Sequence, residues 1–228
     1  MTELALPGAH VTFSNRLGGV SVGPYASLNL GVLTDDDRAN VTENRSRLAA
    51  AAGLRPDRVA MGRQVHGVDL QEWDAPPDGV LREVDGHVTA VPGLGLLVLA
   101  ADCYPVALSD GGSVAMLHCG WRGVAGGIIE RGVAALRPGA AAAVGPGIGP
   151  CCYEVGPEVL DAFAGLDGVV RGRMLDLRAA ISLKLERAGV ASVEHLEHCT
   201  SCREDLYFSH RRDAGVTGRQ GGLVTLGA

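Results

Sequence analysis

Two histidines and one cysteine stand where strands are expected to end, and these residue types can bind a transition metal. His66 precedes a glycine, Cys103 follows an apolar run and Asp102, and His118 closes another apolar segment. Side chains at strand ends can converge on one point even when they are far apart along the chain. Two imidazole nitrogens and one thiolate leave a tetrahedral zinc ion with an open fourth position, which is the arrangement of a catalytic site.

The same residues allow a second chemistry that needs no metal. In a Cys–His nucleophilic pair, His66 or His118 would deprotonate Cys103, and Asp102 would orient the base. The third interpretation is structural, since a histidine at a strand end is commonly a satisfied boundary residue and an unpaired cysteine is often a small hydrophobe. The spacing matches no local metal-binding signature. From residue types alone, all three interpretations stay open.

The other cysteines give weaker signals. Cys199 and Cys202 form a single CxxC. A zinc ribbon needs a second CxxC, and a thioredoxin motif opens a helix after an early strand, so the pattern favours an ordinary structural role. Cys151 and Cys152 are adjacent, and their side chains would diverge in an extended segment, so we expect at most one of them to face a site. Cys119 is expected to pack in the core.

Several arginines are candidates for binding an anion. Arg16 lies in the long loop of residues 15–31, Arg122 begins a predicted helix, and Arg211 is near the C-terminus. A guanidinium fork matches phosphate and carboxylate geometry, although each arginine can instead be solvated or paired with an acidic residue. The glycines of residues 145–149 predict tight turns rather than a phosphate loop, because the Lys-Ser/Thr ending is absent.

Strands are predicted along the whole chain. His10–Ser14 is expected to be the first strand and Gly222–Leu226 the last. The apolar run Leu94–Ala101 is expected to be a strand buried on both faces. Val106–Ser109 and Val114–His118 are expected to be its sheet neighbours and to form a hairpin, because an Asp-Gly-Gly turn joins them.

Helices alternate with these strands. The segment Asp37–Ala52 reads as a helix capped by Asp35 or Asp36, and Gly120–Ala135 reads as a strand-to-helix junction. Asp176–Gly189 is predicted as an amphipathic helix with a glycine stop. No internal repeat or break in composition divides the sequence. We therefore predict an α/β fold with mixed sheets flanked by helices, in a single domain over residues 1–228.

Composition excludes several classes of function. The chain has 228 residues, of which 46% are apolar and 20% charged, and these values are typical of a globular domain with a sizeable core. Its net charge of −6 argues against a nucleic-acid partner. Leu94–Ala101 is the longest apolar stretch and is too short to span a bilayer, and the N-terminus lacks a targeting pattern. We expect a cytoplasmic protein with no membrane partner, and no oligomeric state is predicted.

Six motifs, in order along nearly the whole chain, resemble the YfiH family of multicopper-polyphenol-oxidase-like "laccase domain" proteins. They are NRLGGVS with SLNLG within residues 15–31, QVHG at 64–67, ADCYPV at 101–106, HCGWRG at 118–123, GIGPCCYEVG at 147–156 and FSHRRD at 208–213. The sequence departs from the usual pattern at Cys119, where alanine is commoner, and at residues 85–89, where DGHVT stands in place of DALIT.

The resemblance implies an α/β fold of the CNF1/YfiH-like type and a zinc ion bound by His66, Cys103 and His118. It also implies purine nucleoside phosphorylase activity, including cleavage of methylthioadenosine, and deamination of adenosine. The family carries two further labels, polyphenol oxidase and an editing factor for peptidoglycan precursors. A laccase needs several coppers and paired HxH motifs, and this chain has 7 histidines and no HxH, so polyphenol oxidation is disfavoured.

We therefore predict a zinc enzyme, with copper as the alternative metal, that cleaves adenosine, inosine or methylthioadenosine with phosphate and also deaminates adenosine. Arg16, Arg122 and Arg211 are expected to bind phosphate or ribose, Asn29 to orient the substrate, and Asp102 to fix a ligand or move a proton. The rival hypotheses are a cysteine-type hydrolase that edits peptidoglycan precursors and a non-catalytic metal-binding protein.

Overall fold

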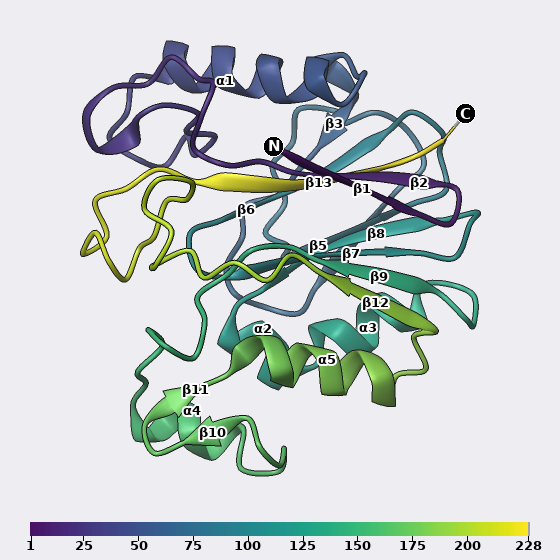
Figure 1. Ribbon diagram of the computed structural model, residues 1–228. Helices are drawn as coiled ribbons and strands as arrows, with labels where there is room; N and C mark the ends of the chain where they lie inside the picture. Colours follow the sequence, from purple (N-terminus) through teal and green to yellow (C-terminus); the bar gives the residue numbers. More distant parts are fainter. Residues whose placement is uncertain (228) are drawn as a thin grey trace.

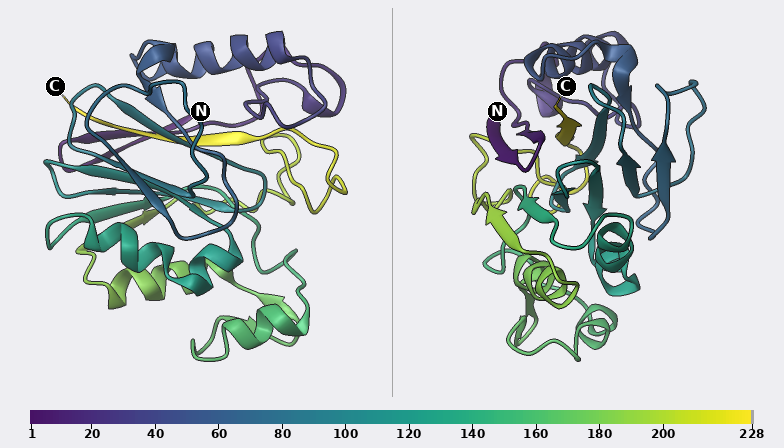
Figure 2. Two further views of the ribbon diagram at one scale, coloured as in Figure 1. Left: turned by 180° about the vertical axis from the view of Figure 1, so that it is seen from behind. Right: turned by 90° about the vertical axis from the view of Figure 1, so that its right-hand side faces the viewer.

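Two β-sheets pack face to face, and helices cover the outer face of each, in the computed structural model, which describes residues 1–227 (Figure 1). The side view shows the same succession of layers, with the blue α1 on one side and the teal and green helices on the opposite side (Figure 2). The predicted α/β class, with mixed sheets flanked by helices, is confirmed.

The first sheet has five strands and joins the two ends of the chain. In spatial order they are β1 (Thr2–Leu6), β2 (Ala9–Phe13), β13 (Gln220–Leu226), β6 (Gly95–Ala100) and β3 (Val59–Ala60). The C-terminal strand β13 pairs antiparallel with both β2 and β6. Helix α1 (Arg38–Ala51) covers the outer face of this sheet, where Leu48 packs with Leu97 and Leu223.

The second sheet has six strands. In spatial order they are β12 (Ser192–His195), β9 (Ala141–Val144), β7 (Tyr104–Ser109), β8 (Val114–Cys119), β5 (Gly86–Thr89) and β4 (Leu70–Trp73). The predicted hairpin is present, since β7 and β8 pair antiparallel. Three helices pack on the outer face: α2 (Trp121–Gly126), α3 (Ile128–Ala134) and α5 (Leu177–Arg187). At the periphery lie α4 (Pro157–Ala162), the short hairpin of β10 (Val170–Arg171) and β11 (Met174–Leu175), and the 3-10 turns η1 (Gly23–Tyr25) and η2 (Pro56–Arg58).

The central core lies between the two sheets. Phe13, Val98 and Val224 from the first sheet pack there with Met116 and Ala143 from the second, and all five are fully buried. Burial of a large apolar side chain contributes about 1.5–3 kcal/mol to folding. This layer therefore fixes the two sheets against each other and sets how the strand ends of one sheet lie relative to those of the other.

One strand prediction was wrong. Leu94–Ala101 was expected to share a sheet with Val106–Ser109 and Val114–His118, but β6 lies in the five-stranded sheet, across the core from β7 and β8. The run is apolar on both faces for a different reason. Leu96 and Val98 face the opposite sheet, whereas Leu97 packs beneath α1.

Local capping also differs from the prediction in detail. Asp37, rather than Asp35 or Asp36, caps α1, because its carboxylate accepts a hydrogen bond from the backbone N–H of Ala39 at 2.8 Å. Gly127, with φ of +100°, divides the predicted helix of residues 120–135 into α2 and α3.

Within residues 1–227, no helix combines the length and apolar character that crossing a bilayer requires.

Candidate active site

A cavity of about 580 Å³ opens where strands of both sheets end. One wall consists of Leu99–Cys103, at the end of β6, and another of His118, Trp121 and Arg122, where β8 leads into α2. The loop that carries His66 and the segment Ile148–Tyr153 contribute further lining residues. A volume of this size can enclose a nucleoside-sized molecule.

Three metal donors meet in this cavity. The ligand atoms of His66, Cys103 and His118 all lie within 4.8 Å of one another. The two imidazole rings stand edge to face, with centroids 4.9 Å apart. His118 is buried, Cys103 is partly buried and His66 is exposed, so the group can be reached from solvent on one side. Two nitrogens and one sulfur at this separation fit a single zinc-sized ion and leave a coordination position open.

Asp85 holds two of these donors in place, and the sequence analysis did not select it. Its Oδ1 accepts hydrogen bonds from Nδ1 of His118 at 2.7 Å and from the backbone N–H of His66 at 2.9 Å. Its Oδ2 accepts from the backbone N–H groups of Val65 and Gly67 at 3.0 and 2.7 Å. A carboxylate bound to one imidazole nitrogen directs the other nitrogen to a metal, which is the usual support of a metal-binding histidine.

The electrostatics of the group favour charged forms. Burial alone would raise the pKa of Asp85, but His118 and the N–H groups of Gly67 and Val65 lower it to about 2. Burial would also raise the pKa of the Cys103 thiol, yet the neighbouring imidazoles of His118 and His66 lower it to about 6. The thiolate is therefore accessible near neutral pH, and it is the form of cysteine that binds metal or attacks a carbon.

Asp102 joins loops instead of orienting a histidine. Its Oδ1 accepts a hydrogen bond from Oγ1 of Thr200 at 2.7 Å, and its Oδ2 accepts from the backbone N–H of Arg211 at 2.7 Å. Its backbone oxygen accepts from Ile148 at 2.9 Å, and its φ is +89°, a conformation that non-glycine residues rarely adopt. The expectation that Asp102 orients the base is therefore corrected, since Asp85 occupies that position beside His118.

The cavity has a positive lining in an acidic protein. Of the predicted anion-binding residues, Arg122 and Arg211 line the cavity, as do Arg45, Arg63 and Arg219, which the sequence did not single out. Asp102 is the one carboxylate among the lining residues of the described chain, and both of its oxygens are engaged. The lining is therefore suited to a small anion.

Two predicted substrate contacts lie away from the cavity. The Arg16 guanidinium stacks over Phe208 at 4.8 Å and donates to the backbone oxygens of Ala26 and Glu204, so it joins the loop of residues 15–31 to a second segment of backbone. Asn29 is buried, and its Oδ1 accepts from the backbone N–H of Arg219 at 2.8 Å. Both residues lie outside the cavity lining and bind backbone groups of neighbouring loops.

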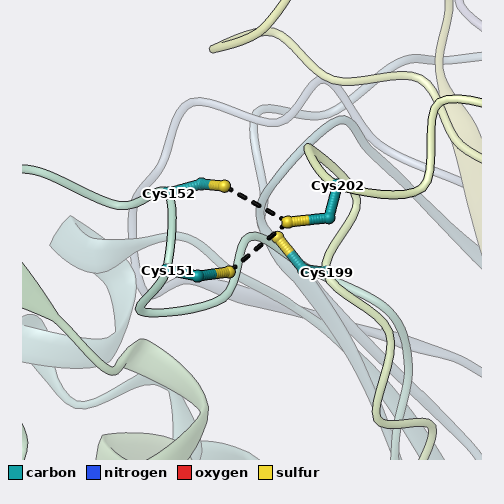
Figure 3. A group of neighbouring side chains, drawn as sticks. All are labelled: Cys151, Cys152, Cys199 and Cys202. Carbon is teal, nitrogen blue, oxygen red and sulfur yellow. Dashed lines mark hydrogen bonds between the residues drawn. The ribbon is translucent and has the colours of Figure 1, made fainter.

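The cysteine predictions have mixed outcomes. Cys119 is fully buried in the core, as expected. The expectation that Cys151 and Cys152 diverge is wrong, because their sulfurs lie 3.5 and 3.4 Å from the sulfur of Cys202 (Figure 3). The two residues sit in a tight turn instead of an extended segment, so both side chains project to one side.

Comparison with known proteins identifies the family. Residues 10–227 match the family described as "Multi-copper polyphenol oxidoreductase laccase". A purine nucleoside phosphorylase of Deinococcus radiodurans is 44% identical over 98% of this chain and 90% of its own. The purine nucleoside phosphorylase YfiH of Escherichia coli is 34% identical over 99% of this chain and all of its own.

The chain belongs to the YfiH family. The crystal structure of YlmD from Geobacillus stearothermophilus superposes with a TM-score of 0.90 at 36% identity, covering 97% of this chain and 93% of YlmD. The family resemblance seen in the sequence motifs and its α/β fold are thus confirmed.

Proposed function

We propose that this protein is a zinc-dependent purine nucleoside phosphorylase that cleaves adenosine, inosine or methylthioadenosine with inorganic phosphate, and that it also deaminates adenosine. Relatives named purine nucleoside phosphorylase, at 34–44% identity over nearly the whole chain, support a function of this kind. The observation that carries the proposal is the coincidence of a metal-donor group and several arginines in one cavity of about 580 Å³.

The donor set fits zinc. His66, Cys103 and His118 supply two borderline nitrogen ligands and one soft sulfur ligand, and Asp85 supports His118 from behind. A zinc ion held there supplies a positive charge that can polarise a group of the substrate. A multicopper oxidase needs several histidine-rich copper sites, and within residues 1–227 this group is the one metal-donor cluster that contains histidine. Polyphenol oxidation therefore stays disfavoured.

Arginines are the expected phosphate ligands. Arg219 is partly buried, and burial lowers the pKa of its guanidinium, whose Nη1 is held by the backbone oxygens of Thr217 and Gly218. Arg211 is held by a hydrogen bond from Nη1 to the backbone oxygen of Glu154 at 2.7 Å. Guanidinium groups fixed in this way keep N–H donors for an incoming anion and lose little side-chain entropy when it binds.

The rest of the lining suits a nucleoside. Tyr153 and Trp121 offer aromatic surface for a purine, and Leu99 and Met61 add apolar contacts. His210 also lines the cavity and is outside the metal-donor group, so we propose that it acts as the general acid that protonates the departing purine. The proposal places the enzyme in the cytoplasm, where the six free thiols would remain reduced.

The test is to assay the full-length protein with adenosine and phosphate. We expect the wild type to release adenine and ribose 1-phosphate, and we expect Cys103→Ala to reduce this release to background. Cys119→Ala is the matched control, since it removes a buried thiol that belongs neither to the cavity lining nor to the donor group, and it should retain activity. Full activity of Cys103→Ala would refute the proposal.

One observation favours a second candidate, a cysteine-type hydrolase that acts on an amide of a peptidoglycan precursor. Cys103, His118 and Asp85 form a connected series in which the pKa of the thiol is lowered to about 6 and that of the imidazole is raised to about 9, although burial opposes both shifts. Such a series can activate a nucleophile without metal. Hydrolysis by chelator-treated protein, blocked by thiol alkylation, would support this candidate.

A further inference from the structure

Four cysteine side chains converge at a second point, outside the lining of the cavity. Cys151 and Cys152 project from one loop, and Cys199 and Cys202 project from another, so that the four sulfurs meet between the loops (Figure 3). All four sulfurs lie within 4.8 Å of one another. We propose that Cys151, Cys152, Cys199 and Cys202 bind one zinc ion as a closed, structural four-thiolate site.

The fold explains why cysteines so far apart in sequence meet. Strands β9 and β12 are parallel neighbours, so the loops that follow them both begin at the carboxyl ends of the strands, on the same side of the sheet. The pairing continues beyond the strands, because Gly147 and Cys199 form a parallel bridge and the backbone N–H of Thr200 donates to the oxygen of Gly147 at 3.0 Å. The adjacent cysteines of one loop are thereby placed opposite the CxxC of the other.

The spacing of the sulfurs suits one metal ion. Zn–S bonds of about 2.3 Å place the sulfurs of a tetrahedral site about 3.8 Å apart. The sulfur of Cys202 lies 3.5 Å from that of Cys151 and 3.4 Å from that of Cys152, close to this value. A disulfide would require about 2.05 Å, and all four cysteines are free. Four thiols packed around one point leave room for an ion at their centre.

A backbone N–H supports one of the four sulfurs, and the donor group found among the described residues consists of cysteines alone. The backbone N–H of Gly149 donates to the sulfur of Cys199 at 3.2 Å, as N–H groups commonly support metal-bound sulfur. The nearest imidazole in sequence, His198, is bonded through Nδ1 to the hydroxyl of Tyr207 at 2.9 Å. Four thiolate ligands are typical of zinc or iron sites, and such ligands bind zinc more tightly than ferrous iron. A zinc site with four protein ligands is structural, since it leaves no open position.

The site would stabilise one wall of the cavity. Ile148 and Tyr153, which flank Cys151 and Cys152, line the cavity. The loop of Cys199 continues through Thr200, whose hydroxyl donates to Asp102 at 2.7 Å. A zinc ion between the loops would fix these groups relative to each other, so its role is to position the cavity wall without contacting substrate.

The test separates this site from the donor group of the cavity. The full-length Cys103→Ser variant lacks the thiolate of the cavity site, so zinc that it retains after dialysis against a mild chelator reports on the four cysteines. We expect about one zinc per chain by elemental analysis, and X-ray absorption showing four sulfur neighbours at about 2.3 Å. Absence of retained zinc, a shell of nitrogen or oxygen neighbours, or iron in place of zinc would each overturn the proposal.

A second comparison locates the ion. Adding Cys202→Ser to Cys103→Ser should abolish the retained zinc, whereas adding Cys119→Ser, which removes a thiol from the core, should leave it unchanged. Cys202 is exposed, so its exchange for serine should leave the core intact, and circular dichroism checks this. The absorption measurement needs no change in the cluster and decides the matter if the variant does not fold. Peptide mapping that finds a disulfide among these cysteines in the freshly purified protein would also overturn the proposal.

Discussion

Replacement of Asp85 by asparagine is the sharpest test of how the cavity site is built. The carboxylate accepts four hydrogen bonds, two at each oxygen, from Val65, His66, Gly67 and His118. Asparagine has nearly the same shape but only one acceptor oxygen, and its NH₂ group must face two of the four donors. Turned one way, the amide leaves the backbone N–H groups of Val65 and Gly67 without an acceptor. Turned the other way, it leaves the N–H of His66 without one and faces Nδ1 of His118, which can accept only if the ring proton moves to Nε2.

The magnitude follows from this count. Each donor left without an acceptor costs about 1–3 kcal/mol, so with one or two such donors Asp85→Asn should lower the free energy of unfolding by about 1–6 kcal/mol. The loop of His66 and the ring of His118 lose the same support, and loss of such a partner lowers metal affinity about 10–100-fold. Urea unfolding measures the first effect, and competition of zinc with a chromophoric chelator measures the second.

Asp69→Asn is the matched control for this change. Asp69 pairs with Arg131 at 3.0 Å, and its side chain is 75% exposed, so the same substitution there should cost less than about 1 kcal/mol and leave zinc affinity unchanged. If Asp85→Asn behaves like Asp69→Asn in both assays, the argument that Asp85 organises the donor group is refuted.

Three further predictions concern other parts of the structure. Burial lowers the pKa of His87 to about 4, so between pH 6.5 and 4 this side chain is protonated in the unfolded chain but neutral in the folded protein. The free energy of unfolding should therefore fall by about 3 kcal/mol over this range. Urea unfolding across this range should show the extra loss in the wild type but not in His87→Asn, and parallel curves would contradict it. A Cβ on Gly120 would lie 2.9 and 3.0 Å from side-chain atoms of two metal donors, so Gly120→Ala should weaken zinc binding in the chelator assay, whereas Gly165→Ala, with open space around it, should not. Arg219→Met should raise the KM for phosphate about 10-fold or more with little change in the KM for the nucleoside, whereas Arg187→Met, on the exposed surface, should change neither KM. An unchanged KM for phosphate in Arg219→Met would exclude Arg219 as a phosphate ligand.

Part of the candidate site was foreseeable because two of its donors stand at strand ends, whereas His66, which was also expected at a strand end, lies in the loop between β3 and β4. Cys103 immediately precedes β7, and His118 is the second-last residue of β8, as the sequence pattern indicated. Apolar runs and glycine punctuation mark strand ends locally, so residues at these ends can be selected without knowing the sheet order. The convergence of His66 with them was an expectation from residue type, and their atoms do lie within 4.8 Å.

The supporting residues were not foreseeable in the same way. Asp85 stands in a motif that the sequence analysis regarded only as a departure from the family pattern, and nothing local shows that it faces the loop of His66. Arg219 lies next to β13 and enters the cavity because that strand pairs with β6. No second CxxC stands near Cys199 and Cys202 in the sequence. Their neighbours, Cys151 and Cys152, are brought close by the pairing of β9 with β12.

The sequence by itself determined the local elements: where most helices and strands lie, which runs are buried, and the aspartate-glycine turn between β7 and β8. Those features depend on residues within a few positions of each other, through backbone geometry, capping and the period of apolar side chains. Only the tertiary structure decided which sheet β6 joins, which carboxylate supports His118, and that two pairs of cysteines share one point. These outcomes depend on which strands pair. Strand pairing brings together segments that are far apart in the chain, and the local sequence of one segment does not indicate which other segment it will pair with.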